Sequence, residues 1–248
     1  MAQRTRTSSR HEGIDGDGEA IEERMDGETL DGDAASETLR PRGWRHGAAW
    51  TYGVTLVASA VALLTSFILA ADTLYIARHP GTALNCDVNA TLSCSAVAQS
   101  WQAEIIKLGD LSFPNAFFGI AAESVFATIA VIGMARVAVP RWFAICTWWG
   151  GLAALAYSYW LTSQSLFVIE ALCPWCLLLM ASTTIQFMAL THATVTVRGL
   201  PRGDGRLDGL RRFLDSYYRP GLDLLIDVVW VALIAAVILV KDGPALFA

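Results

Sequence analysis

The sequence predicts an all-α integral membrane protein with five membrane-spanning helices. Its 248 residues are 54% hydrophobic, and its mean hydropathy of +0.43 is too high for an ordinary soluble domain. The apolar residues gather in five runs with few charges, and most of these runs are long enough to cross a hydrocarbon core of about 30 Å. This pattern excludes a soluble enzyme and leaves little room for a separate extramembrane domain.

The first 46 residues are expected to form a disordered acidic tail in the cytoplasm. They hold 11 of the 23 acidic residues and almost no large apolar side chains. Such a segment cannot bury enough surface to offset the entropy lost on ordering. It also lacks the short apolar stretch after a basic start that marks a signal peptide. The first apolar run is therefore expected to stay as a membrane anchor.

The membrane spans follow from the apolar runs in chain order. We predict spans over residues 49–74, 115–135, 142–167, 174–197 and 222–240. The fifth span carries Asp223 and Asp227 four residues apart, on one helical face. That face is expected to enter at the level of the lipid headgroups, because charges deep in the membrane are costly.

The orientation follows from the basic residues, which membrane proteins retain in cytoplasmic loops. Fifteen Lys and Arg residues lie in the tail, the 136–141 turn and the 198–219 loop, against three on the other side. We therefore expect the tail and the basic loop 198–221 in the cytoplasm. The 75–114 loop and the C-terminus after the fifth span (222–248) are then outside. The excess of Arg over Lys suggests a bacterial source and so the bacterial plasma (inner) membrane.

The basic loop is expected to set topology and to contact anionic lipid headgroups. Three Asp residues interrupt its basic residues, so no nucleic-acid partner is expected. Two aromatic clusters, Trp148-Trp149 and Tyr157/Tyr159/Trp160, have the spacing and interfacial positions that membrane proteins use for packing or anchoring.

The predicted topology places four of the five cysteines at the outer face. Cys86 and Cys94 lie in the outer loop, and Cys173 and Cys176 begin the fourth span. Disulfides persist on this oxidising side of the membrane. Cys146 lies near the cytoplasmic end of the third span, where it is expected to be an inert apolar residue.

The Cys173-Pro174-Trp175-Cys176 sequence is typical of a redox-active pair. Pro suits the first helical position, which puts the preceding Cys near the helix N-terminus, where thiolates are stabilised. Two dithiols on one face can form a relay, in which one pair exchanges with an external partner and the other with an acceptor in the membrane. Structural disulfides and a metal site remain alternatives, although no His lies near the cysteines.

The same residues resemble the vitamin K epoxide reductase family of membrane thiol–quinone oxidoreductases. Cys86 to Val97 fits the family motif C-D-V-x5-C-S-x-V, and Ser100 stands where the family has a Ser or Thr just after it. Asn115 to Gly119 resembles the N-x-x-F-G segment that opens the second span, and the CxxC opens the fourth. The similarity covers about residues 49–197.

This resemblance implies a four-transmembrane-helix bundle around a quinone pocket, capped by the outer loop and a short half-helix, with the fifth helix outside the similarity. It implies that Cys176 lies nearest the quinone and that Cys173 exchanges with the loop. Cys86 and Cys94 would be the shuttle pair that takes electrons from a thioredoxin-fold protein. The acceptor would be a membrane quinone, menaquinone or ubiquinone.

The resemblance also implies a set of quinone-pocket residues. Asn115 would hydrogen-bond a quinone carbonyl and Phe118 would pack on the ring. The other expected pocket residues are Gly119, Ser100, Trp175, Met180 and Glu123.

Two of these pocket residues need comment. The family often has Tyr at the position of Met180, so a second hydrogen bond to the quinone is not expected from there. Glu123 lies about two turns inside its span, where an acid is costly. It is expected either to donate a proton to the reduced quinone or to be a hydrogen-bonded packing residue.

The function that these expectations favour is oxidation of a separate thioredoxin-fold partner, in support of disulfide formation in exported proteins. Only residues 241–248 follow the fifth span, which is why the partner is expected to be a separate protein. Two alternatives remain from the sequence. One is a vitamin K quinone or epoxide reductase, and the other is a non-enzymatic membrane scaffold or metal-binding protein.

Overall fold

The computed structural model describes residues 44–89, 91–104, 106–109, 111–137, 139–196 and 222–246. The predicted tail lies outside the described residues except at its last three positions. The predicted basic loop 198–221 lies wholly outside them.

Five long helices correspond to the five predicted spans, to within three residues at the C-terminal ends of the second, third and fourth spans. They are α2 (Ala48–Arg78), α4 (Asn115–Met134), α5 (Arg141–Gln164), α6 (Pro174–Thr196) and α8 (Leu222–Leu246). All five include a stretch long and apolar enough to cross a membrane. The predicted class, an all-α multi-pass membrane protein, is confirmed. The third span is completed by a π-helical turn, η3 (Ser165–Ile169), which continues α5.

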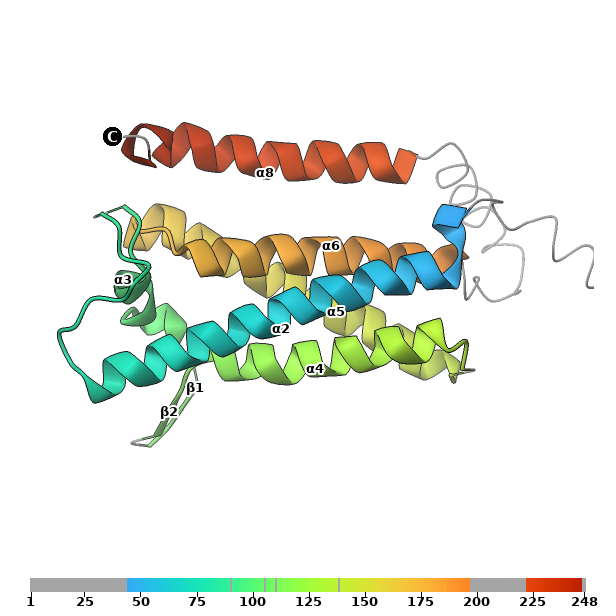
Figure 1. Ribbon diagram of the computed structural model, residues 1–248, viewed down its shortest axis with the longest axis horizontal. Coiled ribbons are helices and arrows are strands. Elements are labelled where there is room, and N and C mark those ends of the chain that lie inside the picture. The colour runs from blue at the N-terminus through green and yellow to red at the C-terminus, as the bar shows by residue number, and fades with distance from the viewer. Residues whose placement is uncertain are drawn as a thin grey trace, which may run out of the picture. The chain divides into compact units, whose positions relative to one another are not determined.

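The bundle forms where α2 packs against α4 and α6, and α5 packs against α6 (Figure 1). Small side chains line the buried face of α2, which lets helix backbones approach closely. Gly119 and Gly133 of α4 face this helix: a Cβ on Gly119 would lie 2.6 Å from Ser66 Oγ, and one on Gly133 would meet the Tyr52 ring. The fit between α2 and α4 therefore depends on these two glycines.

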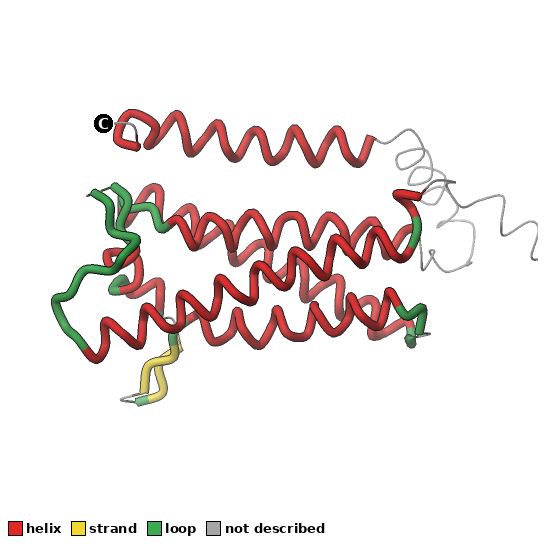
Figure 2. Tube along the Cα trace, in the orientation of Figure 1, coloured by secondary structure: helices red, strands yellow, loops and turns green. Residues whose placement is uncertain are grey.

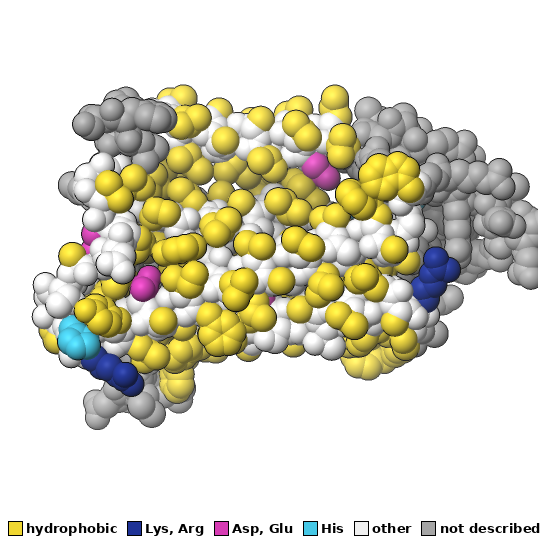
Figure 3. All heavy atoms as spheres, viewed as in Figure 1, with side chains coloured by type: hydrophobic (Ala, Val, Ile, Leu, Met, Phe, Trp, Pro, Cys, Tyr) yellow, Lys and Arg dark blue, Asp and Glu magenta, His cyan; other side chains and the backbone are white. Residues whose placement is uncertain are grey.

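Hydrophobic side chains cover the face of the helices shown in Figure 3, and the Lys, Arg and His side chains visible there lie toward the helix ends. Large apolar residues such as Val57, Leu64 and Val125 are more than half exposed. Lipid is the environment in which such a surface is stable.

The segment between α2 and α4 gathers at one end of the helices (Figures 1 and 2). It contains the short helix α3 (Cys94–Ala98), the 3-10 turn η2 (Trp101–Ala103) and an antiparallel hairpin of β1 (Ile106–Leu108) and β2 (Leu111–Phe113). The Ser93 side chain caps α3 by accepting a hydrogen bond from the backbone N–H of Ala96. This end of the bundle is where Cys86, Cys94, Cys173 and Cys176 meet.

The opposite end differs from the expectation of a tail that is disordered up to residue 46. Residues Trp44–His46 form a 3-10 turn, η1, directly before α2. The Trp44 ring packs edge-on against Trp50 with centroids 4.6 Å apart, and His46 Nδ1 lies 2.9 Å from His192 Nε2 of α6. These aromatic contacts attach the turn to α2 and α6, although the Trp44 side chain itself stays 70% exposed.

Helix α8 makes a specific polar contact with α5. The Trp230 indole N–H donates a 2.8 Å hydrogen bond to the Tyr159 hydroxyl, which lies 3.0 Å from Thr184 Oγ1 of α6. The Tyr159 side chain thus serves helix packing, as its spacing predicted.

Candidate active site

The site is built around two cysteine pairs that meet at one end of the bundle. Cys86 and Cys94 form a disulfide, whereas Cys173 and Cys176 are free thiols. The Cys94 and Cys173 sulfur atoms are 3.4 Å apart. Both of these residues are buried, with 2% and 1% of their surface exposed, whereas Cys86 is half-buried. One residue of the loop pair is therefore partly exposed, and the sulfur of the other contacts the helix pair.

A short backbone pairing holds the two cysteine segments together. Leu92 of the loop forms a parallel bridge with Leu172, the residue before Cys173. The Leu172 N–H donates to the Thr91 carbonyl at 2.7 Å, and the Ser93 N–H donates to the Leu172 carbonyl at 3.0 Å. Because Cys94 and Cys173 directly follow the paired residues, this pairing sets the sulfur contact.

Asp87 lies between Cys86 and Cys94 in the chain, and its side chain holds the loop together through hydrogen bonds. Its carboxylate accepts hydrogen bonds from the Leu84 and Ser95 backbone N–H groups and from the Ser93 and Ser95 hydroxyls. Partial burial raises the pKa of Asp87. The hydrogen bonds, led by that of the Ser95 hydroxyl, outweigh burial and lower the pKa to about 2. The carboxylate is thus charged at neutral pH and fixes both ends of the loop.

The CxxC begins α6 as the sequence predicted, with Pro174 as the first helical residue. The Cys176 thiol hydrogen-bonds to Cys173 and is the main cause of a lowered Cys173 pKa. The backbone N–H groups of Cys176 and Trp175 lower it further, while burial and the Asp72 charge oppose them. This environment favours the thiolate of Cys173, which is the form that attacks a disulfide.

An apolar cluster surrounds the sulfur atoms. Leu84, Cys94 and Cys173 form its buried centre, and Leu69, Val97 and Trp175 are among the residues packed against it. Trp175 was predicted as a pocket residue. It lies in this cluster but does not line the cavity. The cluster separates the Cys94 and Cys173 sulfurs from water.

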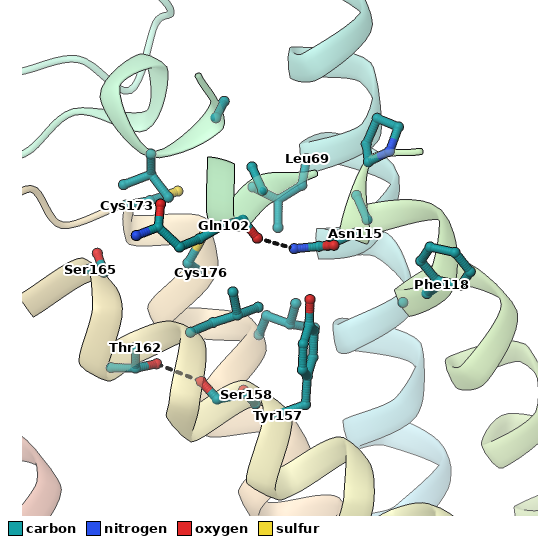
Figure 4. Close-up of a pocket in the computed structure, with 18 of the residues that line it drawn as sticks. Leu69, Gln102, Asn115, Phe118, Tyr157, Ser158, Thr162, Ser165, Cys173 and Cys176 are labelled. Carbon is teal, nitrogen blue, oxygen red and sulfur yellow. Dashed lines mark hydrogen bonds between the residues drawn. The ribbon is translucent and has the colours of Figure 1, made fainter. Parts of the chain in front are cut away.

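A cavity of about 380 Å³ lies beside the cysteine pairs (Figure 4). Eight of the eleven predicted site residues line it: Cys94, Cys173, Cys176, Ser100, Asn115, Phe118, Gly119 and Glu123. Cys86 is on the loop side of its disulfide, away from the cavity lining. Met180 is buried in α6 and does not line the cavity.

The cavity suits a flat apolar molecule with a few polar atoms. The exposed surface of its lining is mostly apolar, and its polar groups include Asn115, the Cys176 thiol and several Ser and Thr hydroxyls. The Asn115 amide donates one hydrogen bond to the Gln102 backbone carbonyl, which fixes the side chain and leaves a second N–H. The Ser100 hydroxyl donates to the Val97 carbonyl at 2.7 Å, so its proton is directed away from a ligand. These residues fit a quinone.

Glu123 lies deeper along α4 and is 3% exposed. Its carboxyl group is hydrogen-bonded to the Gln186 side chain of α6. Its Oε2 atom and Gln186 Oε1 are buried without a hydrogen-bond partner among the described residues. Glu123 thus reaches the cavity while keeping one oxygen unpaired.

The sequence reasoning missed one wall of the cavity, which α5 and η3 supply. The lining residues there include Ala154, Tyr157, Ser158, Leu161 and Ser165. Their spacing of three and four residues marks one helical face, so the sequence contained a usable signal. Tyr157 was instead assigned to packing or anchoring at the interface.

Two further points from the sequence concern the alternative of a metal site and the position of Cys146. In the described ranges, no three His, Cys, Asp or Glu side chains gather in a way that holds a metal ion. Cys146 is a free, exposed thiol on α5, near the helix end opposite the other four cysteines.

Comparison with known proteins agrees with the motifs. No curated protein matches the chain. The Vitamin K epoxide reductase family matches over residues 54–191, which is more than half of the chain and includes all four cysteines of the site. With its membrane-spanning helices and paired cysteines, the chain belongs to the Vitamin K epoxide reductase family and is a membrane oxidoreductase.

Proposed function

We propose that this protein is a thiol–quinone oxidoreductase that oxidises a separate thioredoxin-fold protein and passes the electrons to a membrane quinone. In this role it supports disulfide formation in exported proteins. The observation that carries the proposal is the 3.4 Å contact between the Cys94 and Cys173 sulfurs, beside the cavity that Cys176 lines.

Electrons enter through Cys86. Its sulfur belongs to the half-buried residue of the loop disulfide, whereas Cys94 is buried. A partner thiolate attacks Cys86, the Cys86–Cys94 bond breaks, and Cys94 leaves as a thiolate. The second partner thiol then attacks the mixed disulfide, so the partner becomes a disulfide and the loop becomes a dithiol.

The electrons then pass between the two cysteine pairs. The Cys94 thiolate attacks Cys173 in the oxidised CxxC, and Cys176 leaves as a thiolate. Cys86 next attacks Cys94, which restores the loop disulfide and leaves Cys173 and Cys176 reduced. A loop disulfide with two helix thiols, as the structure has them, is the state that this exchange would leave.

The helix dithiol would pass its two electrons and two protons to a quinone bound in the cavity. Cys176, which lines the cavity, is the thiol that would face it, and Cys173 closes the new disulfide. The Asn115 amide is placed to donate to a carbonyl oxygen, and Phe118 provides an apolar wall. Glu123 reaches the same cavity and would serve as a proton donor.

The proposed location is the bacterial plasma membrane, with the N-terminus inside and the cysteine site outside. The excess of basic residues in the tail, the 136–141 turn and the 198–219 loop supports this orientation. The quinone would be menaquinone or ubiquinone, dissolved in the same membrane.

The test is quinone reduction by the purified, detergent-solubilised protein supplied with a small dithiol. The wild type is expected to turn over and Cys176→Ser to be inactive. Cys86→Ser should keep activity with the small dithiol and lose it with a thioredoxin-fold protein. Cys146→Ser is the matched control, because this exposed thiol lies apart from the site. A wild type that reduces neither ubiquinone nor menaquinone analogues would contradict the proposal and favour a structural role for the cysteines.

A further inference from the structure

We propose that the Tyr157 hydroxyl donates a hydrogen bond to a carbonyl oxygen of the bound quinone. It thereby supplies from α5 the contact that Met180 of α6 cannot give. This inference rests on the proposed function, because it names a recognition residue of the same cavity.

Tyr157 is placed in the cavity wall opposite the start of α4. It lines the cavity, and its hydroxyl points toward Asn115 in the close-up (Figure 4). The two side chains come from different helices, α5 and α4, so together they offer a ligand two polar groups from two walls.

The Tyr157 ring is held in position by other aromatic side chains. It stacks on Trp160 with centroids 5.8 Å apart and an interplanar angle of 26°. Trp160 in turn meets Trp101 of η2 edge-on, with centroids 6.3 Å apart. These contacts orient the ring, which stays 38% exposed, and the hydroxyl is left to make a polar contact.

The Tyr157 hydroxyl forms no hydrogen bond with any described residue, whereas the other hydroxyls of the cavity wall, except that of Ser158, donate within the protein. Ser100 donates to the Val97 carbonyl, Thr162 to the Ser158 carbonyl and Ser165 to the Ala171 carbonyl. A phenol hydroxyl next to an apolar cavity loses free energy when its donor stays unused. An acceptor on the ligand would satisfy it.

The acceptor that fits is a carbonyl oxygen on a flat ring. A phenol donates one hydrogen bond, and quinone oxygens are acceptors. The thioether of Met180 has no donor, and that residue is 5% exposed outside the cavity lining. Tyr157 is thus the tyrosine available to the quinone in this chain's cavity.

The test measures binding without turnover. The full-length protein, oxidised at both cysteine pairs and kept without reductant, is titrated with a short-chain benzoquinone and a short-chain naphthoquinone, and tryptophan fluorescence reports the bound fraction. Tyr157→Phe keeps the ring and removes only the hydroxyl. Loss of one neutral hydrogen bond should raise the Kd about 3- to 10-fold.

Tyr159→Phe is the matched control. It lies two residues along the same helix, and its hydroxyl bonds to Trp230 and Thr184 rather than facing the cavity. The quinone Kd of this variant should equal that of the wild type.

The outcomes separate this inference from the proposed function. If the wild type binds quinone and Tyr157→Phe binds it equally well, the role of Tyr157 is overturned and the proposed function stands. If the wild type binds neither quinone, the proposed function fails and the inference fails with it. A weaker affinity of Tyr157→Phe that comes with a lower unfolding temperature would assign the effect to ring packing and would also overturn the inference.

Discussion

The sulfur atoms of Cys94 and Cys173 lie 3.4 Å apart although 79 residues separate them in the chain. The contact depends on two sets of interactions that hold the loop. The Leu92–Leu172 backbone bridge joins the loop to the segment before α6, and the hydrogen bonds to Asp87 fix the loop itself. Disulfide exchange needs the attacking sulfur to lie in line with the disulfide at close distance. A loop that is held in place therefore positions the Cys94 sulfur for exchange with Cys173.

The first prediction concerns Asp87→Asn. The amide nitrogen would replace one acceptor oxygen and face donors from Leu84 and Ser95. Hydrogen bonds to a charged group are worth about 1.5–3 kcal/mol, so we expect roughly a tenfold or greater fall in the rate of exchange between the loop and the CxxC. Stopped-flow measurement of that exchange tests it.

Glu104→Gln is the control for this substitution. The Glu104 carboxylate lies in the same segment between α2 and α4 and accepts a hydrogen bond from Ser112 instead of binding the cysteine loop. Its exchange rate should stay at the wild-type value. Equal rates for the Asp87 and Glu104 variants would contradict the role of Asp87.

A pH dependence follows from the lowered pKa of Asp87. A carboxyl group whose pKa is lower in the folded protein stabilises the fold above its unfolded pKa of about 3.9. That contribution is lost as the pH falls through the folded pKa of about 2. The protection factors of the loop amides, which are corrected for the pH dependence of intrinsic hydrogen exchange, should therefore fall between about pH 4 and pH 2. A wild-type loop that behaves like Asp87→Asn over this range would contradict the prediction.

Gly119→Ala should separate α4 from α2. The added Cβ would lie 2.6 Å from Ser66 Oγ and 3.3 Å from Ser66 Cβ, and such overpacking costs about 1–3 kcal/mol. A lower thermal unfolding temperature is expected, and the double variant with Ser66→Gly should recover most of it. A double variant no more stable than Gly119→Ala would show that another contact is responsible.

Glu123→Gln tests whether this residue donates a proton. The amide keeps the size of the side chain and can still bond to Gln186, so the fold should persist. We expect slower quinone reduction with a changed pH profile, and unchanged thiol exchange between the cysteine pairs. Ser124→Ala, on the exposed face of the same helix, is the control. Unchanged turnover across pH would assign Glu123 to packing.

The membrane spans were predictable because composition decides them: lipid requires long apolar helices, and each predicted run lies in a helix. The cysteine motifs were equally readable, since Pro174 marks the start of α6 beside Cys173. The turn η1 was missed because Trp44 is a single large apolar residue after an acidic segment, and its partner Trp50 lies inside the first span.

The cavity wall was only partly predictable, because periodicity shows which residues share a helical face but not what that face meets. Tyr157 and Tyr159 are two residues apart on α5, yet one lines the cavity and the other bonds to α8. The position of Met180 outside the cavity lining likewise depends on the rotation of α6 in the bundle. Such rotations are set by packing contacts between distant residues.

The central claim, direct exchange between Cys94 and Cys173, is tested most directly by trapping. In Cys86→Ser with an oxidised CxxC, the Cys94 thiolate attacks Cys173 and releases the Cys176 thiolate. No Cys86 remains to resolve the mixed disulfide between Cys94 and Cys173. Alkylation of the released Cys176 prevents return, and peptide mapping without reductant identifies the linked cysteines. We predict a Cys94–Cys173 disulfide that is missing from Cys94→Ser; a Cys94–Cys176 link, or no link between loop and helix, would contradict the account.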